Sequence, residues 1–336
     1  MLLDIENLSV CYRTPRGVLN AVDDLSLGVA RGETLGLVGE SGCGKSSLGR
    51  AIVGLVDLAG GTVRLDGKDI NGLTHRQSLT WRRRMQMVFQ DPLSALDPRK
   101  TVRRTLTIPL DVHRIGTSAE RRERVDALLH RVGLAPALAG RLPHELSGGQ
   151  RQRVNIARAL SLDPDVLICD EPVSALDVSL QAQVLNLLAD LQRERAITGL
   201  FISHDLAAVS YVADRIAVMY LGQIVEILSR DELWHHAAHP YTQLLIESIP
   251  GRGARLPMPS SAELPNPYAP PRGCRFEQRC PRAMPVCRET PPALSELGGG
   301  HVVACHLYDD IALPPSSAGK TWPIHEVTET TASRSI

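Results

Sequence analysis

The sequence predicts an α/β fold built on a mostly parallel β-sheet. Short apolar runs rich in β-branched residues alternate with segments of helical periodicity up to about residue 230, which is the pattern of repeated βαβ units. The predicted strands are 34–39, 86–90, 166–170, 200–203 and 215–220, and the predicted helices lie near 45–55, 149–161, 179–195 and 206–213. A chain of 336 residues has room for this core and for an appendage.

Two segments of the first 250 residues depart from this alternation. Residues 1–30 partly alternate polar with apolar side chains, which predicts an antiparallel layer against one edge of the sheet. Strand signals disappear around residues 100–145, where arginine-rich helical periodicity ends at Gly133. We therefore expect a helical subdomain, about 91–160, inserted into the α/β core.

The chain changes character after about residue 230. Eleven of the 23 prolines fall within residues 250–292, a density that helix and sheet interiors do not tolerate. The polar segment beyond Pro314 is expected to fray. The sequence thus predicts a main domain over 1–250, an irregular Pro/Cys-rich C-terminal extension over 251–313 and a flexible tail over 314–336.

The charge balance argues against nucleic acid as a partner. Lys and Arg number 37 and Asp and Glu also number 37, so the formal net charge is zero and no basic field exists to hold a polyanion. No apolar run approaches the ~18 residues of a membrane span, and the first residues lack the order of a signal peptide. We expect a cytosolic chain whose contact with a membrane is peripheral.

A phosphate-binding pattern, G-x-x-x-x-G-K-[ST], occupies residues 39–46 between a predicted strand and a predicted helix. Glycines let backbone N–H groups close around phosphate oxygens, and the helix directs its positive end at them. We expect Lys45 to reach the β- and γ-phosphates and the Ser46 hydroxyl to ligate Mg²⁺. The expected nucleotide contacts are Gly39, Glu40, Ser41, Gly42, Cys43, Gly44, Lys45, Ser46 and Ser47.

Two carboxylates follow the apolar run 166–170, at the sheet edge where the phosphate loop also lies. Phosphoryl transfer needs a carboxylate near the metal and a group that aligns the attacking water. We expect Asp170 to hold Mg²⁺ through its shell and Glu171 to polarise water, since side chains alternate along a strand. The alternative is that both acids merely open a solvated turn.

A second anion-binding pattern, Leu146-Ser-Gly-Gly-Gln150, lies between these two elements. Ser147, Gly148 and Gly149 open a predicted helix and present a hydroxyl and free N–H groups, with Gln150 next in the chain. One chain cannot easily bring two such loops to one ATP. The ordered motifs of about residues 3–250 closely resemble the ATP-binding cassette (ABC) family, in which LSGGQ of one subunit closes over ATP held by another.

The resemblance implies roles for four further residues. Tyr12 resembles the aromatic residue that stacks on adenine, and Gln90 the glutamine that touches Mg²⁺ and water. Asp177 resembles part of the loop that crosses the dimer interface, and His204 the switch histidine at the γ-phosphate. The alternatives are a core aromatic for Tyr12, a strand-end amide for Gln90, a helix cap for Asp177 and a structural histidine for His204. The catalytic set is then Lys45, Gln90, Glu171 and His204.

The remaining ten histidines receive no role. His144 lies near LSGGQ, and three others form the group His235-His-Ala-Ala-His239. A solvated surface explains both better than a metal site.

The branch of the family is indicated by residues 91–99, 171–179 and 218–226, which resemble the oligopeptide/dipeptide permease ATPases. Residues 239–245 are similar to a segment typical of that branch, and the Ser41-Gly-Cys-Gly44 loop resembles its second, F-type ATPase subunit. The resemblance implies a heterodimer with a related ATPase on two membrane permease subunits, at the cytoplasmic face of the membrane, fed by an extracytoplasmic substrate-binding protein.

Two alternatives to peptide import remain at this stage. The first is an ABC importer ATPase for nickel or another small solute, since the ATPase subunit does not touch the cargo. The second is a soluble ABC protein without a transport role. Such proteins generally carry two cassettes in one chain or a long coiled-coil insertion, and neither is visible in this sequence.

Four cysteines, Cys274, Cys280, Cys287 and Cys305, fall close together in the C-terminal extension. The expected cytosolic location disfavours disulfides, and structural zinc usually takes close C-x2–4-C pairs, which do not occur here. The subunits that this chain resembles carry a similar cysteine set assigned to a 4Fe-4S centre. We expect a 4Fe-4S cluster, with zinc as the second alternative and unligated thiols as the third.

Overall fold

The computed structural model describes residues 1–249 and 266–311. The expected tail, 314–336, and the first part of the expected extension, 251–265, lie outside the described residues. Two β-sheets organise the rest, a four-stranded sheet in the order β2-β1-β4-β5 and an eight-stranded sheet in the order β11-β12-β10-β9-β3-β8-β7-β6. The α/β fold predicted from the sequence is confirmed.

The larger sheet is parallel from β9 to the edge strand β6. Strands β3, β6, β7, β8 and β9 pair in parallel, whereas β10 joins β9 in antiparallel fashion. Their bounds are β3 Thr34–Val38, β6 Met85–Val88, β7 Val166–Asp170, β8 Thr198–Ser203, β9 Arg215–Tyr220 and β10 Gln223–Ser229. Strands β3 and β7 are buried along their whole length, as expected for parallel strands that are covered on both faces.

The smaller sheet forms the antiparallel layer predicted for the first 30 residues. It contains β1 Leu3–Thr14, β2 Gly17–Val29, β4 Gly60–Leu65 and β5 Lys68–Asp69. One apolar core lies between this layer and the larger sheet and includes Leu48 and Ile52 of α1 (Lys45–Ile52). A Cβ at Gly49 would come within 2.9 Å of Ile202 Cδ1, so a glycine lets α1 pack closely on the sheet.

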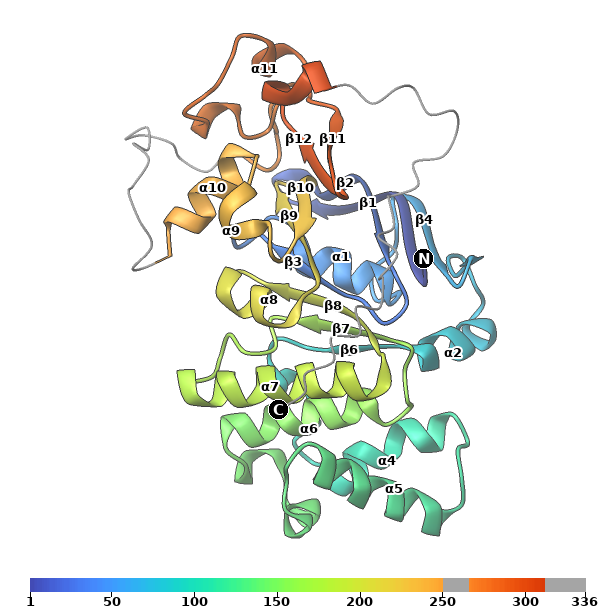
Figure 1. Cartoon of the computed structure of the whole chain (residues 1–336). Coiled ribbons are helices and arrows are strands. Elements are labelled where there is room, and N and C mark those ends of the chain that lie inside the picture. The colour runs from blue at the N-terminus through green and yellow to red at the C-terminus, as the bar shows by residue number, and fades with distance from the viewer. Residues whose placement is uncertain (250–265, 312–336) are drawn as a thin grey trace.

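Helices cover the other face of the larger sheet and extend into the predicted helical subdomain (Figure 1). A second apolar core joins them to the sheet. The helices before the LSGGQ pattern are α2 His75–Arg84, α3 Pro92–Ala95, α4 Val102–Val112, α5 Ser118–Arg131, η1 Pro136–Gly140 and η2 Pro143–Glu145. The helices after it are α6 Gly148–Leu160, α7 Val178–Arg195, α8 Leu206–Val212, α9 Leu233–His236 and α10 Pro240–Glu247.

The C-terminal extension contains more regular structure than its proline content predicts. After η3 Glu277–Arg279 and α11 Val286–Glu289, the strands β11 Leu294–Gly298 and β12 His301–Ala304 form a hairpin, and η4 His306–Ile311 follows. Strand β12 pairs with β10 and so adds the hairpin to the large sheet. The expectation of an irregular extension is therefore wrong for residues 294–304, where positive φ angles at Gly298–Gly300 form the turn.

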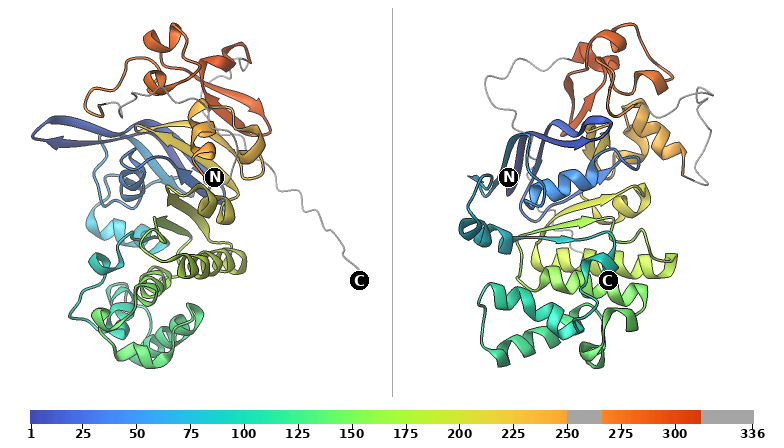
Figure 2. Two further views of the ribbon diagram at one scale, coloured as in Figure 1. Left: turned by 90° about the vertical axis from the view of Figure 1, so that its left-hand side faces the viewer. Right: turned by 180° about the vertical axis from the view of Figure 1, so that it is seen from behind.

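The extension and the helical subdomain occupy opposite ends of the molecule. Figures 1 and 2 show β11, β12 and α11 at one end and α4 and α5 at the other, in all three views. The parallel strands lie between them. The two segments that depart most from the α/β pattern therefore sit on opposite sides of the core.

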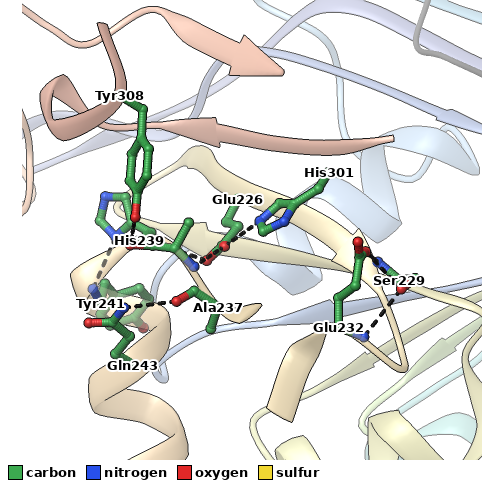
Figure 3. A network of polar contacts seen from close by, with 10 residues as sticks. Glu226, Ser229, Glu232, Ala237, His239, Tyr241, Gln243, His301 and Tyr308 are labelled. Atoms are coloured by element: carbon green, nitrogen blue, oxygen red, sulfur yellow. Dashed lines mark hydrogen bonds and ion pairs between the residues drawn. The ribbon is translucent and has the colours of Figure 1, made fainter. Parts of the chain in front are cut away.

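A buried polar network joins β10 to the extension (Figure 3). The Glu226 carboxylate is fully buried and accepts hydrogen bonds from the backbone N–H groups of Ala238 at 2.6 Å and His239 at 3.2 Å. His301 of β12 places Nε2 2.7 Å from the same carboxylate, and the Tyr308 hydroxyl donates to the Ala238 carbonyl. The partners of Glu226 in this network, Ala238, His239 and His301, all lie C-terminal to the parallel strands in sequence.

The expectation of a solvated surface is wrong for His239 and holds for its neighbours. His239 is only 1% exposed, and its Nδ1 accepts a hydrogen bond from the N–H of Tyr241, which caps α10. His144, His235 and His236 are exposed. The sequence pattern suggested one group, but Pro240 starts a helix that turns His239 inward.

Burial of His239 predicts a pH-dependent stability. Burial lowers the pKa of this imidazole to about 4 from 6.5, so protonation favours the unfolded chain. The free energy of unfolding is therefore at its full value above about pH 6.5. It falls by up to about 3 kcal/mol as the pH drops to about 4. In His239→Asn the new side chain can still cap α10 but does not titrate. We expect the difference in free energy of unfolding between the wild type and this variant to shrink between pH 7 and pH 4 in denaturant titrations, and a constant difference would contradict the prediction.

Candidate functional site

A cavity of about 650 Å³ opens where the carboxyl ends of the parallel strands meet. The phosphate-loop pattern follows β3, Gln90 follows β6, Glu171 follows β7 and His204 follows β8. All four segments line the cavity together with Tyr12. The structure thus brings together the residues that the sequence predicted for one site.

Glycine is required at two positions of the phosphate loop. Gly39 has a φ of 156°, and a Cβ there would lie 2.2 Å from the Met219 carbonyl oxygen. Gly44 has a φ of 110°, and a Cβ there would lie 1.9 Å from the Ala21 carbonyl oxygen. The loop can therefore approach its neighbours closely and lead into the N-terminus of α1, where free N–H groups attract phosphate.

Lys45 is held inside the loop. Its ammonium group donates hydrogen bonds to the carbonyl oxygens of Gly39 at 2.7 Å and Glu40 at 2.9 Å, and the residue is 4% exposed. These two bonds fix the ammonium group over the centre of the loop. A cation fixed there is suited to an incoming phosphate without a large side-chain rearrangement.

The expected magnesium ligands Ser46 and Asp170 are in direct contact. The Ser46 hydroxyl donates to Asp170 Oδ1 at 2.7 Å, and burial raises the pKa of Asp170. The other carboxylate oxygen, Oδ2, is buried without a hydrogen-bond partner in the described part of the chain. A buried oxygen without a partner is costly unless a cation or water satisfies it, so this pair fits a magnesium ion.

Three predicted catalytic side chains meet at Glu171. Its Oε2 accepts a hydrogen bond from Gln90 Nε2 at 3.1 Å and lies 3.3 Å from His204 Nδ1. Glu171 also has a φ of 44°, which is strained for a residue with a side chain. That conformation turns Glu171 toward the cavity, whereas the preceding Asp170 is completely buried.

Tyr12 also lines the cavity, and it lies on β1 of the antiparallel layer. Its hydroxyl donates to Ser47 Oγ at 3.2 Å. Tyr12 is half-buried and packs against the apolar core that the antiparallel layer shares with the larger sheet. Its position leaves stacking on a nucleotide base as a prediction.

The LSGGQ residues and Asp177 lie outside the lining of this cavity. Ser147 caps α6 through a capping box with Gln150, in which Ser147 Oγ accepts from the Gln150 N–H at 3.3 Å. Asp177 accepts from the Leu180 N–H at 3.0 Å and caps α7. Both caps are local, and Ser147, Gly148, Gly149, Gln150 and Asp177 do not line the cavity of their own chain.

Part of the C-terminal region, which no sequence motif predicts at this site, also reaches the cavity. Pro267, Pro270 and Arg275 line it beside Tyr12. The Tyr241 hydroxyl accepts a hydrogen bond from the Glu40 N–H at 2.9 Å. Tyr241 lies in the segment 239–245, whose sequence resembles one branch of the family. No sequence signal places the other three near the phosphate loop.

The four cysteines of the extension are close enough to influence one another. The Cys274 N–H donates to the Cys287 carbonyl at 2.8 Å. Burial, together with the charges of the neighbouring cysteines, raises the pKa of the Cys274 and Cys305 thiols to about 11. Within residues 1–249 and 266–311, however, no three His, Cys, Asp or Glu side chains are grouped so as to hold a metal ion.

In the described ranges no helix has the length and apolarity needed to cross a bilayer.

The fold and the cavity together define an ABC-type ATPase. The family model described as ABC transporter matches residues 22–174, and the one described as oligopeptide/dipeptide transporter, C-terminal region, matches residues 225–287. The chain belongs to the ABC transporter family, in the branch of the oligopeptide and dipeptide transport ATP-binding proteins. As a member it is an ATPase that uses ATP with Mg²⁺, is membrane-associated through permease partners, and dimerises.

Two relatives illustrate how much of the chain the similarity covers. The oligopeptide transport ATP-binding protein AppF of Bacillus subtilis is 50% identical over 87% of this chain and 91% of its own length. The probable peptide ABC transporter ATP-binding protein y4tS of Sinorhizobium fredii is 49% identical over 91% of this chain and 90% of its own. The similarity therefore includes most of the C-terminal region.

Two solved structures support the fold. The ATP-binding cassette MJ0796, a dimer bound to ADP and Pi in a post-hydrolysis state, matches with a TM-score of 0.63 and 29% identity over 68% of this chain and 98% of its own. The cbiO1 protein of Clostridium perfringens, part of the cbiONQ transporter complex, matches with a TM-score of 0.62 and 30% identity. The match covers 70% of this chain and 91% of the cbiO1 chain.

Replacement of Glu171 tests the catalytic arrangement. Glu171→Gln keeps the size of the side chain and a hydrogen-bonding group near Gln90 but removes the charge that polarises water. We expect ATP turnover to fall by about 100- to 10,000-fold while ATP binding persists. The matched control is Glu123→Gln at an exposed position of α5, which should leave turnover unchanged. Unchanged turnover in Glu171→Gln would remove this residue from the catalytic set.

Proposed function

We propose that this chain hydrolyses ATP to power the import of dipeptides or oligopeptides through a membrane permease. The observation that carries the proposal is the combination of an ATPase cavity with a C-terminal region like that of oligopeptide/dipeptide transporters. The names of the relatives AppF and y4tS also specify peptide transport. Nickel or another small solute is the second candidate cargo, because cargo does not contact the cavity described above.

The proposed roles follow the geometry of the cavity. The loop of residues 39–47 binds the phosphates with Lys45, and Tyr12 stacks on adenine. Ser46, Asp170 and Gln90 hold Mg²⁺, while Glu171 polarises the attacking water and His204 senses the γ-phosphate. Ser147, Gly148, Gly149 and Gln150 complete the site of a second chain, since they are remote from the cavity of their own chain, and Asp177 lies at that interface.

The proposed assembly is a heterodimer with a second, related ABC ATPase on two permease subunits. It is peripheral, at the cytoplasmic face of the membrane, and an extracytoplasmic substrate-binding protein delivers the cargo. Within the chain we propose an ATPase domain over 1–250 with a helical subdomain at about 91–160, an extension over 251–313 and a tail over 314–336. The position of α4 and α5 apart from the sheet supports this subdomain (Figure 1).

A transport assay tests the proposed cargo. The chain is co-expressed with its permease and partner ATPase, and the complex is placed in liposomes with the substrate-binding protein. We expect ATP-dependent accumulation of labelled dipeptides or oligopeptides that is lost in Glu171→Gln, because hydrolysis must be coupled to translocation. Accumulation of nickel but not of peptides would support the second candidate, and ATP hydrolysis without any transport would argue for a non-transport role.

We also propose that Cys274, Cys280, Cys287 and Cys305 hold a 4Fe-4S cluster. The chemistry of the donor set fits, since four partly or fully buried thiols influence one another and lie in short loops or, for Cys287, in the short helix α11. Thiols with raised pKa values ionise only when a cationic group compensates their charge, and an iron-sulfur cluster would supply that charge. Zinc is the second candidate, and as placed in the described residues no three His, Cys, Asp or Glu side chains are grouped to hold either metal.

Metal analysis of protein purified without oxygen tests this proposal. We expect about four iron and four sulfide per chain, with both lost in Cys280→Ala. The control is Cys11→Ala on β1, where the cysteine is exposed and far along the chain from the set. One zinc per chain without sulfide would favour the second candidate, and the presence of neither metal would leave the four thiols unligated.

A further inference from the structure

A salt bridge connects the C-terminal extension directly to the phosphate loop. Arg279 of η3 donates from both terminal guanidinium nitrogens to the Glu40 carboxylate, at 2.7 Å and 2.8 Å. Glu40 is the second residue of the phosphate-loop pattern. A two-point contact of this kind restricts the orientation of both groups more than a single contact does.

Arg279 is held rigidly on the side of the extension. Its side chain is 10% exposed and lies against the contacting rings of Tyr220 and Phe276, with its central carbon 5.7 Å and 5.8 Å from the ring centroids. The Tyr220 hydroxyl is 3.3 Å from one of its nitrogens. The side chain therefore cannot swing away from Glu40 without leaving an aromatic pocket.

Glu40 is restrained at three points around its backbone and side chain. Its N–H donates to the Tyr241 hydroxyl at 2.9 Å, and its carbonyl accepts from the Lys45 ammonium group at 2.9 Å. The carboxylate binds Arg279. The position of the Lys45 ammonium group thus depends on the same residue that Arg279 anchors.

The contact also neutralises a negative charge on the cavity wall. Glu40 lines the cavity, so an unpaired carboxylate there would repel a bound triphosphate. Arg279 neutralises this carboxylate from behind the loop. Arg275, from the same segment, contacts Asp23 and the Leu221 carbonyl at the rim, so the extension touches the cavity at a second place.

We propose that Arg279 is a positioning residue for ATP binding, which acts by holding and neutralising Glu40 in the phosphate loop. Because Arg279 belongs to the C-terminal extension, correct folding of that segment is needed for full affinity of the site for ATP. Cys274 and Cys280 flank the segment that carries Arg279, so the extension is coupled to ATP binding by a short, defined path. The proposal rests on the assignment of residues 39–46 as the phosphate loop, and it does not depend on the cargo.

Steady-state ATP hydrolysis by the assembled complex tests the proposal. We expect Arg279→Gln to raise the KM for ATP by about 10-fold and to leave kcat within about threefold at saturating ATP. A fluorescent ATP analogue should show the same loss of affinity for the purified full-length chain. A purely structural role would instead lower the active fraction, and with it kcat, at an unchanged KM.

Three variants make the test specific. Arg279→Lys keeps the charge but not the two-point contact and should restore part of the affinity. Glu40→Gln approaches the same contact from the loop side and should raise KM less, since its amide can still accept one hydrogen bond. The double variant Arg279→Gln/Glu40→Gln should bind ATP no more weakly than Arg279→Gln alone, because both changes break one contact.

Two controls separate the outcomes. Arg288→Gln removes an exposed ion pair with Glu277 in the same extension and should leave KM unchanged. Lys45→Ala should abolish ATP binding, and if it does not, the assignment of the phosphate loop fails rather than the role of Arg279. A KM within twofold of the wild type in Arg279→Gln, or losses that add up fully in the double variant, would overturn the proposal.

Discussion

The parallel pairing of β3, β7 and β8 is the constraint on which the rest of the site depends. Val38 pairs with Ser203 and Asp170 with Ile202, so the three strands end at one edge of the sheet. Each strand then delivers a different group to that edge, because a backbone that leaves a strand end is free to turn. The Ser46–Asp170 hydrogen bond at 2.7 Å ties two of these groups together inside the protein.

The second organising feature is the attachment of the C-terminal extension to this frame. The hairpin of β11 and β12 continues the large sheet through β10, and the buried Glu226 carboxylate binds both His301 and the backbone before α10. From this anchored position the extension reaches back to the cavity. A region that is peripheral in sequence is therefore part of the wall of the ATP site.

Sequence patterns predicted the site best where chemistry requires particular residues at fixed spacing. The phosphate loop and His204 follow mostly apolar strands, Asp170 ends such a strand and Glu171 comes directly after it, so both their identity and their location could be inferred. Sequence patterns could not reveal that His239 is buried, because the direction of its side chain depends on the helix begun by Pro240. Nor could they place Arg279 at Glu40, since the two residues are distant in sequence and form no motif.

The sequence by itself determined the class of fold and the chemistry of the nucleotide loop, because these follow from local periodicity and spacing. The second chain was implied by the resemblance of the ordered motifs to the ABC family. Only the tertiary structure decided that the extension joins the main sheet and that Arg279 and Tyr241 hold the phosphate loop. The physical reason is that strand pairing and buried salt bridges join segments far apart in the chain, and their partners are selected by packing rather than by neighbouring residues.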